Sequence, residues 1–198
     1  MSGSAPRTAV LACGALAREA LAVIEADRLG HLELHCLSAL LHNRPERIPA
    51  AVKAKIAELR PDYGRIVVLY ADCGTGGALD RVLAEEGVER IGGPHCYAFY
   101  AGQEVFDELA DAEPGTFYLT DFLARQFDTL VWEGLGLDRH PDLLGAYFGN
   151  YRRLVYLAQT DDAALTAAAE AAARKLGLAF ERRRTGLGGL ADFIRQAA

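Results

Sequence analysis

The chain has 198 residues, of which 51% are hydrophobic, and a net charge of -6 at pH 7. This length can bury a substantial core and favours one domain, which we predict to cover residues 1–198. The acidic balance argues against a nucleic-acid surface. An N-terminus with no apolar signal core, and no apolar run of roughly 18 residues, predict a cytoplasmic protein that does not cross a membrane.

Short apolar segments typical of strands alternate with helical patterns along the whole chain. The expected strands are residues 8–12, 32–37, 65–70, 89–92, 116–119, 154–158 and 179–182. Helical patterns lie between them. In the second half, one helix is expected to begin near residue 96, and others are expected to cover residues 122–132, 147–151, 161–176 and 190–196. This alternation predicts an α/β fold with three layers, in which helices cover both faces of one mostly parallel, Rossmann-like sheet of about six or seven strands.

A repeat with an offset of 60 residues runs through the four cysteines. Its copies are Cys13-Gly14 with His35-Cys36, and Cys73-Gly74 with His95-Cys96. In each copy a Cys-Gly pair ends a strand and opens a helix, and a His-Cys pair follows the next strand. The pattern predicts an internal duplication of a βαβ unit. It also predicts that the four cysteines gather where the parallel strands end, which is the edge that binds ligands in such folds.

Four cysteines in a reducing compartment leave metal binding, redox chemistry and core packing as interpretations. The thiolate at a helix N-terminus is stabilised, and thiolates are metal ligands. A set of Cys13, His42, Cys73 and Cys96 suits zinc. A set with Cys36 in place of His42 suits zinc or an iron–sulfur cluster. Both sets remain open at this point.

The segment 72–77, with the sequence DCGTGG, adds a second kind of candidate site. Here Asp72 and Cys73 are candidate catalytic residues, as a general base and a thiol nucleophile. The candidate cofactor-binding residues are Gly14, Gly74, Gly76 and Gly77. Their backbone could cradle an anion or approach a ligand held by cysteine closely. The segment matches neither nucleotide-binding fingerprint.

Five segments together resemble a known family: LACGALARE, LLHNRPERI, LYADCGTGG, GPHCYAFYAG and PGTFYLTDFL. In this order they are similar to the pattern of the domain-of-unknown-function family 1638, over most of the chain. The polar positions that recur in that pattern correspond to Cys13, His42, Cys73 and Cys96, and do not include Cys36. The resemblance therefore favours the mixed cysteine–histidine set. The chain departs from the pattern at His95, where the family more often has Asp.

Members of that family are often encoded beside corrinoid-dependent methyltransferases. The resemblance therefore implies a metal- or iron–sulfur-binding protein of corrinoid and one-carbon methyl metabolism, with a corrinoid protein or a methyltransferase subunit as partner. As an enzyme, it would be a zinc- or cluster-dependent methyltransferase component. The alternatives are a metal-free scaffold or chaperone for a corrinoid protein, and a hydrolase or lyase that uses Asp72 and Cys73.

Overall fold

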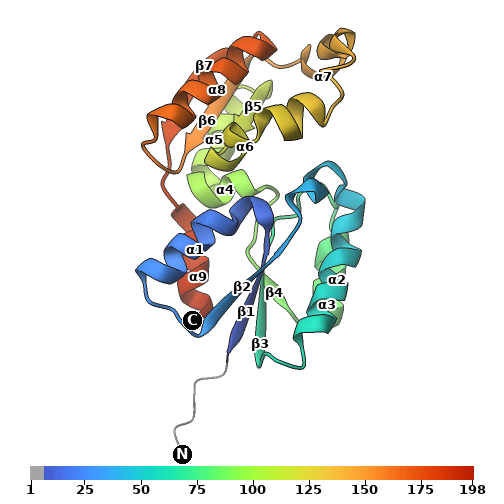
Figure 1. The fold of residues 1–198 in the computed structure, drawn as a ribbon, viewed down its shortest axis with the longest axis vertical. Coiled ribbons are helices and arrows are strands. Elements are labelled where there is room, and N and C mark those ends of the chain that lie inside the picture. The colour runs from blue at the N-terminus through green and yellow to red at the C-terminus, as the bar shows by residue number, and fades with distance from the viewer. Residues whose placement is uncertain (1–6) are drawn as a thin grey trace, which may run out of the picture. The chain divides into compact units, whose positions relative to one another are not determined.

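The computed structural model describes residues 7–198 and divides into two compact units. One unit holds the described residues up to Cys96 together with Gly189–Ala198, and the other holds Tyr97–Gly188. Each unit has its own parallel sheet, so the prediction of one continuous sheet is wrong. The α/β fold class, with parallel strands covered by helices, is confirmed (Figure 1). The prediction of a single domain stays a prediction.

The sheet of the first unit has four parallel strands in the order β2-β1-β3-β4. The strands are β1 (Thr8–Cys13), β2 (Leu32–Leu37), β3 (Arg65–Leu69) and β4 (Glu89–Arg90). The central strands β1 and β3 are apolar on both faces, and Val10, Leu11 and Val68 are completely buried. A strand with two apolar faces needs a layer of helices on each side.

Helices supply both layers of the first unit. They are α1 (Ala17–Ala26), α2 (Ile48–Leu59), α3 (Ala78–Glu86) and α9 (Gly188–Ala197). Figure 1 shows α1 and α9 on one face of the sheet and α2 and α3 on the other. The chain therefore leaves β1 towards one face and β3 towards the opposite face. This divergence creates a topological switch point between β1 and β3, the place where doubly wound sheets bind ligands.

The predicted duplication corresponds to two βαβ units, β1-α1-β2 and β3-α3-β4. Their second strands differ in length. Strand β2 continues one residue beyond Cys36, whereas β4 ends at Arg90, and Cys96 is the first residue of α4 (Cys96–Ala101). The two His-Cys pairs of the repeat therefore occupy different local structures.

The second unit contains a three-stranded parallel sheet in the order β5-β6-β7. Its strands are β5 (Thr116–Leu119), β6 (Arg153–Ala158) and β7 (Ala179–Arg184). The helices α6 (Asp121–Arg125), α7 (Leu144–Phe148) and α8 (Ala163–Leu176) contribute to the larger core, on one face of the sheet. A smaller core on the other face joins α4 and α5 (Gln103–Ala112) to Tyr118, Val155 and Leu157.

Two predicted helices are divided in the structure. The helix expected near Cys96 is split into α4 and α5 at Gly102, whose φ of 83° lies in the left-handed region. In place of the helix expected over 122–132, the structure has the short helix α6, which ends at Arg125, and then a π-helical segment, Phe127–Glu133. The wider turn buries Phe127, Leu130 and Val131 together. Within residues 7–198, no helix has the length and apolar character that a membrane crossing needs.

Candidate functional site

The sulfur atoms of Cys73 and Cys96 lie 3.6 Å apart, although 23 residues separate them in the chain. Two backbone hydrogen bonds join their loops: the N–H of Asp72 donates to the carbonyl of Gly93 (3.1 Å), and the N–H of Cys73 donates to the carbonyl of Pro94 (3.0 Å). Each of the two residues is partly exposed. The loop after β3 and the loop after β4 are therefore fastened together with two reactive side chains in contact.

The backbone of Cys73 has an unusual conformation. Its φ is 51°, in the left-handed region that residues other than glycine rarely adopt. Gly74, Gly76 and Gly77 also have positive φ values. A cysteine in this conformation costs about 1 kcal/mol or more in backbone strain, and such strain occurs most often at functional sites. The loop thus holds the Cys73 sulfur next to Cys96 in spite of a strained backbone at Cys73.

Arg90 stabilises the same pair of loops through hydrogen bonds to their backbone. One of its terminal nitrogens donates hydrogen bonds to the backbone carbonyls of Tyr70, Ile91 and Gly93. The guanidinium group also forms a bidentate ion pair with Asp80, at 2.6 and 3.0 Å. Only 13% of the Arg90 side chain is exposed. A single, partly buried cation therefore ties the ends of β3 and β4 to the start of α3.

The two contacting thiols are electrostatically unequal. Either thiol can donate the hydrogen bond between them, and donation by Cys96 lowers the pKa of Cys73. The same hydrogen bond, together with burial, raises the pKa of Cys96. Proton loss from the pair therefore places the first negative charge on Cys73. A thiolate is the form of cysteine that attacks electrophiles and binds metals.

Cys13 stands at the end of β1, on the other side of the switch point. The residue is 5% exposed, and burial raises the pKa of its thiol to about 11. The buried hydroxyl of Tyr70 lies beside it. As a donor facing the sulfur, this hydroxyl offsets part of the effect of burial and lowers the pKa of the thiol.

His42 lies in a short 3-10 segment, Ala39–Asn43, that follows β2. Its side chain is exposed, but the surrounding protein and the nearby His95 lower its pKa. The ring is therefore neutral at physiological pH, which is the form that binds metals. The electrostatic effect of His95 shows that the loops after β2 and β4 approach each other at this edge.

Cys36 differs from the other three cysteines in its orientation. It pairs with Ala12 across the β1–β2 ladder, whereas Cys13 pairs with Leu37. Residues that are one position out of phase in neighbouring parallel strands point to opposite faces of the sheet. Cys36 is also exposed. The structure therefore does not bring it together with Cys13.

The glycine-rich loop satisfies its own donors. The carboxylate of Asp72 accepts hydrogen bonds from the Thr75 hydroxyl and from the N–H groups of Gly76 (3.1 Å) and Gly77 (2.8 Å). These bonds, led by the one from Thr75, lower the pKa of Asp72 and make it a weaker base. Asp72 thus shapes the loop that carries Cys73, and two of the predicted anion-cradling N–H groups already have an acceptor.

The remaining two predicted glycines serve close packing. A Cβ at Gly14 would lie 2.9 Å from the carbonyl oxygen of Leu37, so this position has no room for a side chain. A Cβ at Gly74 would make an ordinary contact of 3.6 Å with Pro45, but its φ of 83° favours glycine. Both positions draw the loop after β2 towards the cysteines.

Zinc provides a test of whether these residues fit a metal. Two sulfurs that each lie ~2.3 Å from a tetrahedral zinc are roughly 3.8 Å apart. The separation of 3.6 Å between Cys73 and Cys96 matches that spacing. Among residues 7–198, however, no three His, Cys, Asp or Glu side chains already stand in a metal-binding arrangement. The site thus offers two ligands at the right spacing, and Cys13 and His42 would have to move to join them.

Tyr70 and Arg90 belong to this site, although no motif in the sequence singles them out. Tyr70 ends an apolar segment that is typical of a core strand, and Arg90 is one of 21 Lys and Arg residues. Their roles depend on burial beside the cysteine loops, which a single sequence does not show. The one available signal was position, because both residues lie close to the ends of strands that lead into these loops.

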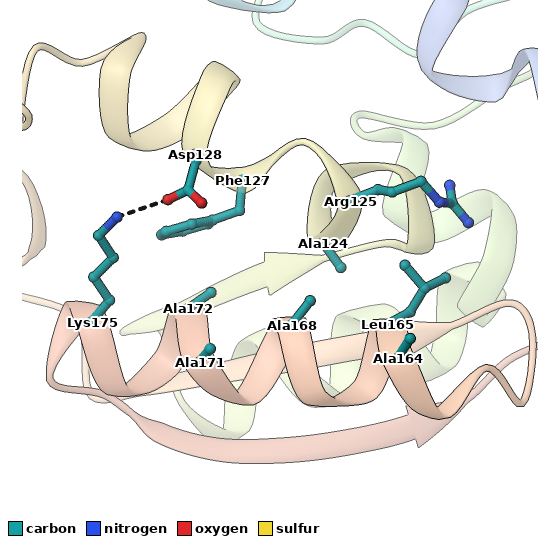
Figure 2. Close-up of a pocket in the computed structure, with 10 residues that line it drawn as sticks. All are labelled: Ala124, Arg125, Phe127, Asp128, Ala164, Leu165, Ala168, Ala171, Ala172 and Lys175. Atoms are coloured by element: carbon teal, nitrogen blue, oxygen red, sulfur yellow. Dashed lines mark hydrogen bonds and ion pairs between the residues drawn. The ribbon is translucent and has the colours of Figure 1, made fainter.

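The second unit has a separate groove of about 360 Å³ between α6 and α8. Figure 2 shows that alanines line its floor and that Lys175 reaches across to Asp128 (2.7 Å). Lys175 also lies over the ring of Trp132, at 4.1 Å from its centre. The groove contains no cysteine or histidine.

Comparison with known proteins gives one match. A family model described as "Protein of unknown function (DUF1638)" matches residues 36–194. The matched segment includes His42, Cys73 and Cys96, and Cys13 precedes it. No curated protein and no solved structure matches the chain.

Proposed function

The chain belongs to the DUF1638 family, and we propose that it is a metal-binding protein whose site consists of Cys13, His42, Cys73 and Cys96. The observation that carries this proposal is the contact between Cys73 and Cys96 at the spacing of two zinc ligands. Their position beside the switch point of the sheet supports it, because ligands of doubly wound folds bind there.

The orientation of Cys36 supports the mixed set of ligands. Cys36 faces away from Cys13 across the β1–β2 ladder, whereas His42 lies on the loop that approaches Gly74 and His95. Three thiolates and one neutral imidazole suit zinc. An iron–sulfur cluster is the alternative occupant, and it would draw on the same cysteines.

Tyr70 fits the surroundings of such a site. Its buried hydroxyl lies next to Cys13, and its pKa is raised by burial and by Cys13, Cys73 and Cys96. The hydroxyl therefore stays protonated and can donate a hydrogen bond to a thiolate. Donors of this kind around ligand sulfurs tune a metal site.

The chemistry that this site supports is methyl transfer that involves a thiolate. Zinc, when bound, would keep the ligand sulfurs and a coordinated thiol ionised at neutral pH. We extend the proposal to corrinoid and one-carbon methyl metabolism, with a corrinoid protein or a methyltransferase subunit as partner. With an iron–sulfur cluster in the site, electron delivery to oxidised cobalt would be the corresponding role.

Metal analysis of protein purified without oxygen tests the central proposal. We expect about one zinc or iron site per chain, with acid-labile sulfide only if a cluster is bound. Cys73→Ala and Cys96→Ala should lose the metal, and Cys36→Ala is the matched control that should keep it. Loss of the metal in Cys36→Ala together with retention in His42→Ala would favour the all-cysteine set. Metal-free protein that folds normally would refute the proposal.

A second experiment tests the role in methyl transfer. Metal-loaded protein is mixed with methylcobalamin and a small thiol, and the cobalamin absorbance is followed. We expect demethylation that is faster than with the Cys73→Ala protein. Equal rates, in spite of bound metal, would separate the metal site from methyl chemistry.

A further inference from the structure

We propose that Cys73 and Cys96 form a redox-active dithiol that a low-molecular-weight disulfide, such as oxidised glutathione, converts into an intramolecular disulfide. The inference shares two cysteines with the proposed metal site but does not require a metal. It assigns a covalent modification to a pair of residues that the metal proposal treats only as ligands.

The contact distance is the first support. A disulfide needs its sulfurs at about 2.05 Å, so the pair at 3.6 Å must close by only about 1.5 Å. Small rotations of two side chains cover such a distance. The backbone hydrogen bonds from Asp72 and Cys73 to Gly93 and Pro94 already hold the two loops together.

Access is the second support. Cys73 and Cys96 are both partly exposed residues, so the pair lies close to the protein surface. Cys13 is buried, and Cys36 stands on the edge strand β2 and points away from Cys13. The fold thus makes one pair of thiols adjacent and keeps it close to the surface, and leaves the exposed Cys36 without an adjacent thiol partner among the described cysteines.

The reaction is a two-step thiol–disulfide exchange. One cysteine of the pair, having lost its proton, attacks a sulfur of the small disulfide, forms a mixed disulfide and releases one thiolate. The second cysteine then attacks the protein sulfur of that mixed disulfide, and a second thiolate leaves. The protein loses two electrons, the small disulfide gains them, and the two cysteine protons end on the two released thiols. The second step is intramolecular, so the contact between the sulfurs gives it a high effective concentration.

The disulfide and the metal site exclude each other. Thiolate sulfur binds zinc, whereas a disulfide sulfur has lost the charge that makes it a ligand. Formation of the Cys73–Cys96 bond would remove two of the four proposed ligands. Oxidation would therefore release the metal, and a bound metal would protect both thiols from oxidation.

The test uses the full chain in reduced, metal-free form. The protein is equilibrated with oxidised and reduced glutathione, its remaining thiols are alkylated, and its peptides are mapped by mass spectrometry. We expect loss of two thiols to a Cys73–Cys96 link and one glutathione adduct on Cys36. Cys73→Ser and Cys96→Ser should each abolish the link, and Cys36→Ser should keep it. Three results for the wild-type protein would overturn the inference: stable glutathione adducts on both Cys73 and Cys96, four free thiols, or a link to Cys13. The peptide map of the wild-type protein distinguishes them even if a variant does not fold.

Zinc binding by the reduced protein, measured against a coloured chelator, separates the two proposals. A protein that forms the link but binds no zinc would support the dithiol and refute the metal site. A protein that binds zinc but never forms the link would do the reverse. When both hold, oxidation should lower zinc retention at least tenfold.

Discussion

The hydroxyl of Tyr156 donates a hydrogen bond of 2.6 Å to the carboxylate of Asp121, in the interior of the second unit. Asp121 is fully buried, and its two oxygens also accept from the N–H of Gln159 and from the N–H and hydroxyl of Thr160. Its own N–H donates to the side chain of Gln159. One carboxylate thus joins the carboxyl ends of β5 and β6.

Replacement of Asp121 by alanine should therefore destabilise the protein strongly. The change leaves the buried donors of Tyr156 and Gln159 unsatisfied, and each costs about 1–3 kcal/mol, so we expect a loss of about 2–6 kcal/mol. Urea denaturation followed by circular dichroism measures it. Asp128→Ala is the matched control, because it removes only an exposed ion pair with Lys175 and should cost about 1 kcal/mol or less. Equal losses in the two variants would contradict this account.

Gly14→Ala tests the close approach of two loops at the candidate site. The new Cβ would lie 2.9 Å from the carbonyl oxygen of Leu37 and 3.3 Å from the N–H of Ala39, both of them backbone atoms. We expect a destabilisation of about 1–3 kcal/mol, measured by thermal denaturation. Gly30→Ala is the control, since nothing lies within 4 Å of the added Cβ. A Gly14→Ala protein as stable as the control would show that the loops separate at little cost.

Arg90→Ala tests whether Arg90 positions the cysteine pair. The substitution leaves three carbonyls without this donor and should cost about 2 kcal/mol. It should also slow the formation of the Cys73–Cys96 disulfide, because the two loops would separate more often. Arg139→Ala, which affects only an exposed arginine, is the control for both readouts. Unchanged disulfide formation in a destabilised Arg90→Ala protein would assign Arg90 to stability alone.

The sequence predicted the location of the site better than its geometry. Strand ends were recognisable from apolar segments, and parallel strands end at a common edge, so all four cysteines were predicted at one edge. Each of them lies near or after the carboxyl end of a parallel strand. The face on which each side chain lies depends on register, which the sequence does not encode locally. The repeat gave Cys36 and Cys96 equivalent places, whereas the structure has Cys36 within β2 and Cys96 at the start of α4.

The division into two sheets was also beyond the sequence pattern. Alternating strands and helices specify the class of fold, but which strands pair depends on long-range contacts. Strand β4 has only two residues and is followed by α4 and α5 before β5 begins. Nothing in the apolar segment at 116–119 indicates that it pairs with β6 and starts a new sheet.

The buried thiol of Cys13 predicts a loss of stability in alkali. Its pKa is 9.0 in an unfolded chain and about 11 in the fold, chiefly because of burial. Below pH 9 both states hold the proton and the contribution is complete. Between pH 9 and 11 the unfolded chain releases the proton first, so the free energy of unfolding falls, by at most about 2.7 kcal/mol. Wild-type and Cys13→Ser proteins, compared by urea denaturation at several pH values, should diverge in this window, because other alkaline titrations affect both. Parallel curves would show that Cys13 is not protonated preferentially in the fold. Tyr70→Phe should raise the pKa of Cys13 further, because the hydroxyl that stabilises the thiolate is lost.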